Sequence, residues 1–245
     1  APAAPKGRFG GGTMTISAVD WLTGSSVEPA VFERWPGYQV TLVAVDHLDT
    51  AVLAAVAEEF LTNAHRHARA AAPGDVDPHT TGWHDAYRDF GIKPRAARPS
   101  SDALIRRAAS EKGLPSINVL VDLYNAISIL HAVPIGGEDL DRYEGPARLA
   151  IASGNEPFHT SSDGQLVVDH PEPGEPVWVD DAGVTCRRWN WRQTNRTAID
   201  HHTTRVGFII DSLDTPSHAG AAAATRRLCE LLPGAITRTI DTTSI

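Results

Sequence analysis

The chain has 245 residues, of which 42% are hydrophobic and 21% charged, and its formal net charge is −8 at pH 7. This length suits one large domain or two small ones, and the composition is typical of a globular protein with a substantial core. The acidic balance argues against a broad, non-specific nucleic-acid surface and still allows a local basic groove. We therefore expect no DNA partner.

The sequence has no run of 18 apolar residues, so it predicts neither a membrane span nor a membrane partner. Residues 1–13 precede the only methionine, Met14, and lack the apolar stretch of a signal peptide. We expect a cloning remnant or disordered tail there, and a cytoplasmic protein. The two cysteines, Cys186 and Cys229, fit a reducing compartment. Neither they nor the scattered histidines have the spacing of metal ligands, so we expect no metal and no cofactor.

The first half of the chain predicts one clear strand followed by helices. Residues 38–45 are a β-branched run after a Pro-Gly pair, which is typical of a strand. Asp49 then caps a helix predicted to run to about residue 72, with its apolar residues on one face. Further helices are predicted at residues 79–90, 103–111 and 117–131.

In the second half the pattern changes to short strands and turns. Residues 134–141 predict a tight turn with three acids, in which Gly136 and Gly137 would let backbone approach a ligand closely. A final amphipathic helix is predicted at 219–232, and the tail that follows has no clear pattern. The predicted strands are residues 147–153, 166–169, 177–180, 184–191 and 205–211.

Charged and aromatic residues are densest between Trp178 and Gln193. Asp180 and Asp181 end an apolar strand, and Gly183 then allows a turn. If the next segment is a strand, alternation places Val184, Cys186, Arg188, Asn190 and Arg192 on one face, and Thr185, Arg187, Trp189 and Trp191 on the other. Arginine beside tryptophan suits a pocket that holds phosphate and stacks a ring. The alternative is a half-exposed hairpin with structural Arg–Asp pairs.

Four segments follow one another in an order that resembles a known family. They are Arg-Pro-Ser-Ser-Asp-Ala-Leu-Ile-Arg-Arg at 98–107, Gly-Leu-Pro-Ser-Ile-Asn-Val-Leu-Val-Asp-Leu-Tyr-Asn at 113–125, Pro-Ile-Gly-Gly-Glu-Asp-Leu-Asp at 134–141 and Val-Trp-Val-Asp-Asp at 177–181. This order resembles the B3/B4 domain of the phenylalanyl-tRNA synthetase beta subunit, here in a free-standing form. The resemblance implies an α/β fold, with a mixed sheet flanked by helices.

The predicted domain organisation follows from the extent of this resemblance. The B3/B4-like domain is expected at residues 97–232, with a C-terminal tail at 233–245. Residues 14–96 offer one strand and two amphipathic helices, too little for a separate stable core. We therefore expect a strand–helix layer packed on the main domain.

In the synthetase this domain is the editing site, which hydrolyses amino acids wrongly esterified to tRNA. The resemblance therefore implies a trans-acting aminoacyl-tRNA deacylase whose partner is tRNA or aminoacyl-tRNA. The family's functional histidine falls on Gly136, and its strand glutamate falls close to Asp211. One alternative is a non-catalytic module that binds tRNA ends or an amino acid. Another is a family member recruited to a different reaction on an aminoacyl or small amino-acid substrate.

The residues expected to carry this chemistry lie in the same segments. Glu138, Asp181 and Asp211 are the catalytic candidates, because carboxylates can hold the substrate ammonium or orient a water. Water-mediated attack is expected since no Ser/His/Asp order is evident, with Cys186 as the alternative nucleophile. Arginine and stacking tryptophan would hold the phosphates and the terminal adenosine. The substrate-binding candidates are Asn125, Gly136, Gly137, Thr185, Arg187, Arg188, Trp189, Asn190 and Arg192.

Overall fold

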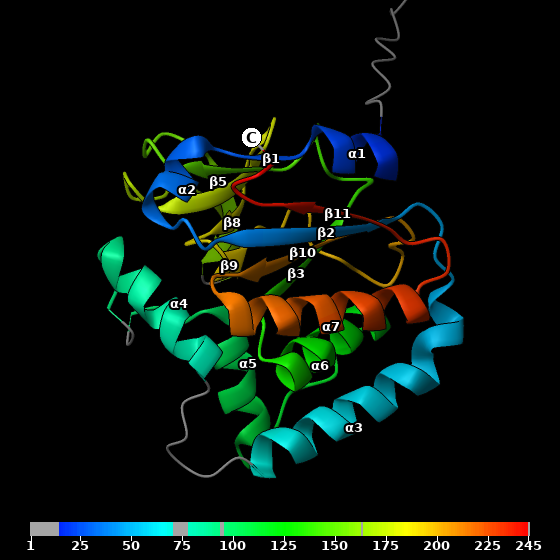
Figure 1. Cartoon of the computed structure of the whole chain (residues 1–245). Coiled ribbons are helices and arrows are strands. Elements are labelled where there is room, and N and C mark those ends of the chain that lie inside the picture. The colour runs from blue at the N-terminus through cyan, green and yellow to red at the C-terminus, as the bar shows by residue number, and fades with distance from the viewer. Residues whose placement is uncertain (1–14, 71–77, 94–95, 163, 245) are drawn as a thin grey trace, which may run out of the picture.

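A four-stranded antiparallel sheet, the central sheet, lies in the middle of the molecule (Figure 1). The computed structural model describes residues 15–70, 78–93, 96–162 and 164–244. The strand order is β11-β2-β10-β3, so an N-terminal strand lies between two strands from the C-terminal part of the chain. The strands are β2 (Gln39–Val45), β3 (Ile135–Asp139), β10 (Val206–Ser212) and β11 (Ile236–Ile240).

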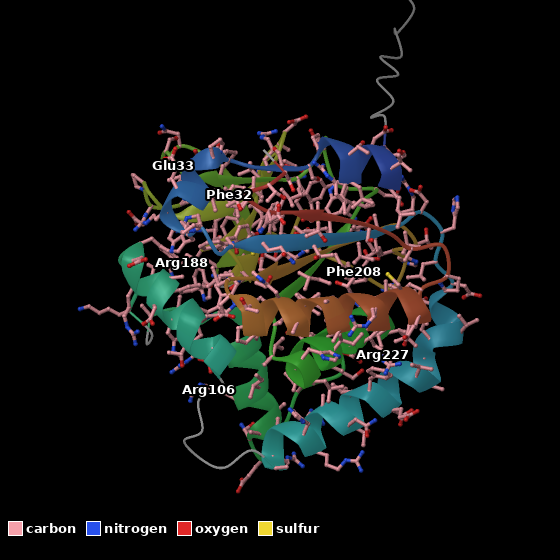
Figure 2. The ribbon with its side chains drawn as sticks, in the orientation of Figure 1. Phe32, Glu33, Arg106, Arg188, Phe208 and Arg227 are labelled. Atoms are coloured by element: carbon pink, nitrogen blue, oxygen red, sulfur yellow. The ribbon has the colours of Figure 1, made fainter. Side chains whose placement is uncertain are left out.

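Helices α6 (Val119–His131) and α7 (Thr215–Leu231) cover one face of the central sheet, and α3 (Ala54–Ala70) packs on α6 (Figure 1). Successive strand side chains point to opposite faces. On β10, Phe208 therefore joins the core beneath the helices, as Figure 2 shows, while Ile209 joins the core on the other face. The Asn118 side chain caps α6 by accepting from the amide of Val121.

A second, five-stranded sheet, the outer sheet, lies on the other side of the central sheet (Figure 1). It is mixed, because β1 runs parallel to β4 and the other neighbouring pairs are antiparallel. Trp21, Leu42, Leu149 and Trp178 pack in the core between the two sheets. The strands are β1 (Ser26–Val27), β4 (Arg148–Ile151), β7 (Pro176–Asp180), β8 (Gly183–Arg187) and β9 (Arg192–Gln193), while β5 (Phe158–Ser162) pairs with β6 (Gln165–Asp169).

Shorter helices surround these layers. In α4, Trp83 and Tyr87 are fully buried, and Trp83 lies against Trp189 with ring centroids 5.2 Å apart. The sequence did not predict the two N-terminal helices or β11. In the described part of the chain, no helix is long and apolar enough to cross a membrane. The remaining helices are α1 (Ala18–Gly24), α2 (Pro29–Arg34), the 3₁₀ helix η1 (Thr50–Leu53), α4 (Pro78–Asp89) and α5 (Ser100–Ala109).

The α/β class expected from the sequence is confirmed, with the strands of the described residues divided among three sheets. The tight turn predicted at 134–141 is wrong, because residues 135–139 form β3 within the central sheet. Position 137 of this strand is a glycine because a Cβ there would come within 2.7 Å of Ile199 and 2.8 Å of Tyr124. The domain boundary at residue 97 stays a prediction, which limited proteolysis would test.

The single strand predicted at 184–191 is also wrong. Strand β8 ends at Arg187, and the chain turns through Arg188 and Trp189, whose φ angles are 48° and 66°. Left-handed backbone is uncommon for such residues, so other contacts must stabilise it. The amide of Trp189 donates to the carbonyl of Pro176, and the hydroxyl of Tyr87 donates to the carbonyl of Arg188. The predicted alternation therefore does not continue past Arg187.

Candidate functional site

A cavity of about 270 Å³ lies between the central and outer sheets. Its floor comes from β3 and β10, its opposite wall from the outer sheet and the turn after β8, and its remaining sides from α5 and α6. The volume is near the lower end of small-molecule sites and suits an amino-acid-sized group. Two of the three catalytic candidates, Glu138 and Asp211, line this cavity.

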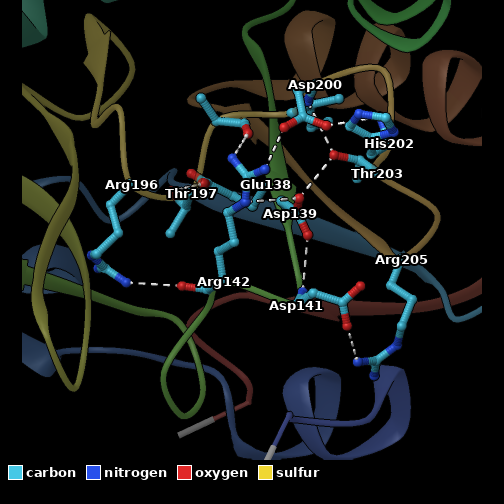
Figure 3. A network of polar contacts seen from close by, with 12 residues as sticks. Glu138, Asp139, Asp141, Arg142, Arg196, Thr197, Asp200, His202, Thr203 and Arg205 are labelled. Carbon is cyan, nitrogen blue, oxygen red and sulfur yellow. Dashed lines mark hydrogen bonds and ion pairs between the residues drawn. The ribbon is translucent and has the colours of Figure 1, made fainter. Parts of the chain in front are cut away.

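Glu138 is 1% exposed on β3 and accepts a hydrogen bond from the hydroxyl of Thr197 (Figure 3). Burial raises the pKa of Glu138 to about 8, because it disfavours the charged form more than its hydrogen bonds stabilise it. The nearby Arg196 is held by both carboxylate oxygens of Asp180, at 2.6 and 2.8 Å. Its charge is therefore already neutralised, and it only partly offsets the burial of Glu138.

The other cations near the end of β3 are also paired (Figure 3). Arg142 forms ion pairs with Asp139 and Asp200, and Arg205 forms one with Asp141 at 2.7 Å. Among the described residues, Glu138 has no ion-pair partner. The described groups that donate to its carboxyl, Thr197 and Gln193, are neutral.

Asp211 is 2% exposed on β10 and lies in a similar environment. Its Oδ1 accepts from the hydroxyl of Tyr38 at 2.7 Å, and its Oδ2 accepts from the side-chain amide of Asn190 at 3.3 Å. Burial raises the pKa of Asp211 to about 7, against these hydrogen bonds, which lower it. No described cation pairs with this carboxyl either.

The strand register places these two acids along one face of the central sheet. Glu138 is opposite Gly207 and Gly136 is opposite Ile209, while the amide of Asp211 bonds to the carbonyl of Pro134. Asp211 thus lies four residues along β10 from Gly207, the residue opposite Glu138. At ~3.3 Å per residue, this places the Cα atoms of Asp211 and Gly207 about 13 Å apart. The Gly136–Ile209 pair lies between them, so the cavity has an acid toward each end and an apolar middle.

The three arginine candidates differ in what they already bind. Arg187 is buried and bonds Glu175 twice, at 3.0 and 2.9 Å, and Asp169 once, at 2.7 Å. Burial opposes its charge, yet these acids outweigh burial and raise the pKa of Arg187. Arg188 lies 4.1 Å over the ring of Trp191, and burial lowers its pKa. Arg192 is exposed, lines the cavity and pairs with no described carboxylate.

The remaining candidates are divided between the cavity and its surroundings. Asn125, Gly136, Trp189 and Asn190 line the cavity. Thr185 is fully buried beside the hydroxyl of Tyr143, 3.1 Å away, and Gly137 faces Tyr124 and Ile199. Asp181 is largely exposed and pairs with Arg148 at 3.0 Å. The site roles given to Asp181, Thr185, Gly137 and Arg187 stay predictions, since these residues are outside the cavity lining.

The structure adds lining residues that the sequence did not single out. Tyr124 comes from the turn of α6 next to Asn125, and Gln193 comes from β9 and donates to the carbonyl of Gly137. Cys186 also lines the cavity, but burial raises the pKa of its thiol well above the usual value. A protonated thiol is a poor nucleophile, which disfavours the covalent alternative. In the described parts of the chain, no three potential metal ligands cluster.

The fold and the cavity define a chain of the mixed α/β class with a small, acid-lined pocket between two sheets. The profile of the B3/4 domain family matches residues 82–227, and the chain belongs to that family. This confirms the resemblance given by the four segments. No curated protein matches the chain.

Among solved structures, the chain is similar to an N-terminal fragment of the phenylalanyl-tRNA synthetase beta-subunit from Pyrococcus horikoshii. The TM-score is 0.42 and the identity 11%, over 87% of this chain and 50% of that fragment. The chain thus spans about half the length of the fragment.

Proposed function

We propose that this chain is a trans-acting aminoacyl-tRNA deacylase, which hydrolyses the ester between an amino acid and the tRNA end. The observation that carries the proposal is the amino-acid-sized cavity of a B3/4 domain, with two buried acids that pair with no described cation. Buried titratable groups with shifted pKa values and no structural partner are typical of functional sites. Family membership supports tRNA as the partner.

In this proposal the acyl group enters the cavity with its ammonium beside Glu138. The positive charge stabilises the carboxylate and lowers the pKa of Glu138 from its value of about 8 in the empty cavity. One carboxylate oxygen contacts the ammonium, while the other orients a water and accepts its proton. The water oxygen adds to the ester carbonyl carbon, the bond to the ribose oxygen breaks, and the proton passes to that leaving oxygen.

A polar amide in the cavity stabilises the developing negative charge. Asn125 lines the cavity and carries N–H groups able to donate to the carbonyl oxygen, while Gln193 donates to the carbonyl of Gly137 and to Glu138. Because the ester is already activated, positioning and one such donor are enough for a useful rate. Arg192 binds the phosphate of the terminal nucleotide, which stays outside the small cavity.

The direct test is to incubate the protein with a panel of charged and mischarged tRNAs and to follow loss of the ester. We expect accelerated loss for at least one of them, reduced about 100-fold or more by Glu138→Gln, as for other groups that act by general base catalysis. Glu230→Gln is the matched control, since it makes the same chemical change on an exposed glutamate outside the cavity lining. Loss no faster than the spontaneous rate for every tRNA would contradict the proposal.

The second candidate is a binding module without catalysis. It is favoured by Gly136, the position at which the resemblance places a functional histidine, because no side chain is available there. A Cβ at Gly136 would meet nothing within 4 Å, so that part of the cavity is open. Tight binding of a charged tRNA with no change in ester lifetime would support this candidate over the first.

A further inference from the structure

The Asp211 end of the cavity combines a buried acid with aromatic walls. Trp178 and Trp189 both line the cavity and are 1% and 0% exposed. Behind Trp189, the rings of Trp35 and Tyr38 lie with centroids 4.6 and 4.9 Å away. Asp211 itself receives hydrogen bonds from Tyr38 and Asn190, which are neutral donors. Asp211 is 2% exposed, and no described cation pairs with its carboxyl.

A carboxyl beside indole rings is the chemistry that recognises alkylammonium groups, because the carboxylate supplies the ion pair and the rings give the cation a polarisable surface. We infer that the Asp211 end binds a cationic group at the end of the substrate's side chain, and that the acyl group is a basic amino acid of the lysine or ornithine type. This inference rests on the proposed function where it concerns an amino acid esterified to tRNA. Binding of the free amino acid does not depend on that function.

The geometry between the two acids fits such a ligand. Their Cα atoms are about 13 Å apart along the strands at ~3.3 Å per residue, and both side chains lie on the same face and line the same cavity. A ligand with two ammonium groups joined by a few methylenes spans this separation once the acids reach inward. Ile209 and Gly136 supply the apolar surface between them, where the methylenes lie.

The charges that face the cavity set how binding depends on pH. The acids are Glu138 and Asp211, and the cation on the lining is the exposed Arg192, which suits the ester and phosphate end. Arg188 is engaged over Trp191 and near Glu175, and Tyr124 and Cys186 stay neutral because burial raises the pKa of each. Burial raises the pKa of Asp211 to about 7, so the empty protein partly protonates it near neutrality. Binding of a side-chain ammonium therefore tightens as the pH rises through this value.

The test compares L-lysine amide with L-norleucine amide on the wild-type protein by titration calorimetry at about pH 7.5. The two probes share the α-ammonium and the aliphatic chain and differ in the terminal ammonium. We expect lysine amide to bind about tenfold or more tightly, and its affinity to fall by a similar factor at about pH 6. Equal or tighter binding of norleucine amide would overturn the inference, and so would no binding of either probe up to about 10 mM.

Asp211→Asn tests whether Asp211 binds the terminal ammonium of the ligand or only maintains the structure of the cavity. It should weaken lysine amide about tenfold and leave norleucine amide unchanged, because only the former has a terminal charge to lose. Equal weakening of both probes by a folded variant contradicts the assignment. If the variant does not fold, the wild-type comparison above still decides.

The same probes distinguish failure of this inference from failure of the proposed function. Preferred hydrolysis of tRNA carrying neutral acyl groups would support a deacylase and contradict the basic substrate. Selective binding of lysine amide with no hydrolysis of tRNA charged with lysine or ornithine would support the basic ligand and contradict the deacylase.

Discussion

Two buried glutamates in this protein have nearly the same exposure and very different surroundings. Glu175 is 2% exposed and is bonded by the guanidinium of Arg187 at 3.0 and 2.9 Å and by the amide of Arg188 at 2.8 Å. Glu138 is 1% exposed and accepts from Thr197, with no described cation as a partner. Burying a carboxylate is costly unless a cation and hydrogen bonds compensate for the lost water.

The difference separates acids that hold the fold from acids that, in the proposed function, bind the ligand. The Arg187–Glu175 pair joins β8 to the chain before β7, so it stabilises the outer sheet, and neither residue lines the cavity. Asp102 belongs to the same class, because hydrogen bonds from Arg106, Arg98 and His84 outweigh its burial and lower its pKa. Glu138 and Asp211 belong to the other class. In the proposed function, the ligand supplies the charge that these two acids lack.

The largest expected effect on stability comes from breaking the Arg187–Glu175 pair. Arg187→Ala leaves Glu175 buried without its cation, and we expect it to lower the free energy of unfolding by about 3–5 kcal/mol. For a chain of this size that corresponds to a fall in Tm of roughly 10 °C. Thermal and urea unfolding would measure both quantities. A loss below about 1 kcal/mol would show that the pair does not stabilise the fold.

The raised pKa of Glu138 should make the free energy of unfolding depend on pH. The pKa of Glu138 is raised to about 8 in the folded protein, so the folded state holds this proton more tightly than the unfolded chain. Stability therefore falls as the pH rises from about 4.5 to about 8, at ~1.4 kcal/mol per pH unit for one proton.

Glu138→Gln removes this titration. The free energy of unfolding of the variant minus that of the wild type should be larger at about pH 8.5 than at about pH 5, by ~2–4 kcal/mol. Urea unfolding across this range measures the difference. Parallel stability curves for the two proteins would mean that Glu138 is not buried as an uncompensated acid.

Two neighbouring glycines provide a smaller and very local comparison. Gly137→Ala places a methyl group 2.7 Å from Ile199 and 2.8 Å from Tyr124, so we expect a loss of about 1–3 kcal/mol. Gly136→Ala meets nothing within 4 Å and should change stability by about 0.5 kcal/mol or less. It projects into the cavity, however, so it should weaken ligand binding. Unchanged binding by the Gly136 variant would place the ligand elsewhere.

The smallest expected effect on stability is that of Arg192→Ala, because this exposed side chain has no described ion pair. We expect a change within about 0.5 kcal/mol. The affinity for tRNA should nevertheless fall several-fold, and the slope of log affinity against log salt should become shallower by about one. Arg192→Lys keeps the charge and should restore the slope. A loss of stability without a change in the slope would assign Arg192 to the fold.

Local sequence patterns predicted the elements that ordinary periodicity describes, such as α6 with its helical apolar spacing and β2 with its β-branched run. They failed where the tertiary structure overrides a local preference. The Gly136–Gly137 pair is typical of a turn, yet it forms a strand because residues 135–139 pair with β10. The turn at Arg188–Trp189 contains no glycine, so the local sequence does not predict its left-handed backbone.

The candidate site was predicted only in part for a related reason. Acids and arginines were recognisable by type, but which of them are paired depends on residues far away in the chain. Arg187 is bound to Glu175 and Asp169, and Arg196 is bound to Asp180. No spacing in the sequence indicated these partners. The unpaired state of Glu138 and Asp211, on which the proposed site rests, therefore emerged only from the three-dimensional arrangement.

The most direct test of the central claim is to measure ester hydrolysis and Tm together for Glu138→Gln and Glu175→Gln. The two variants make the same chemical change at glutamates of equal burial. We expect Glu138→Gln to lose hydrolysis of the charged tRNA and keep or raise Tm at about pH 8, because it removes an uncompensated charge. Glu175→Gln should lower Tm and keep its rate per folded molecule. The reverse pattern, or equal loss of rate in both folded variants, would contradict the account.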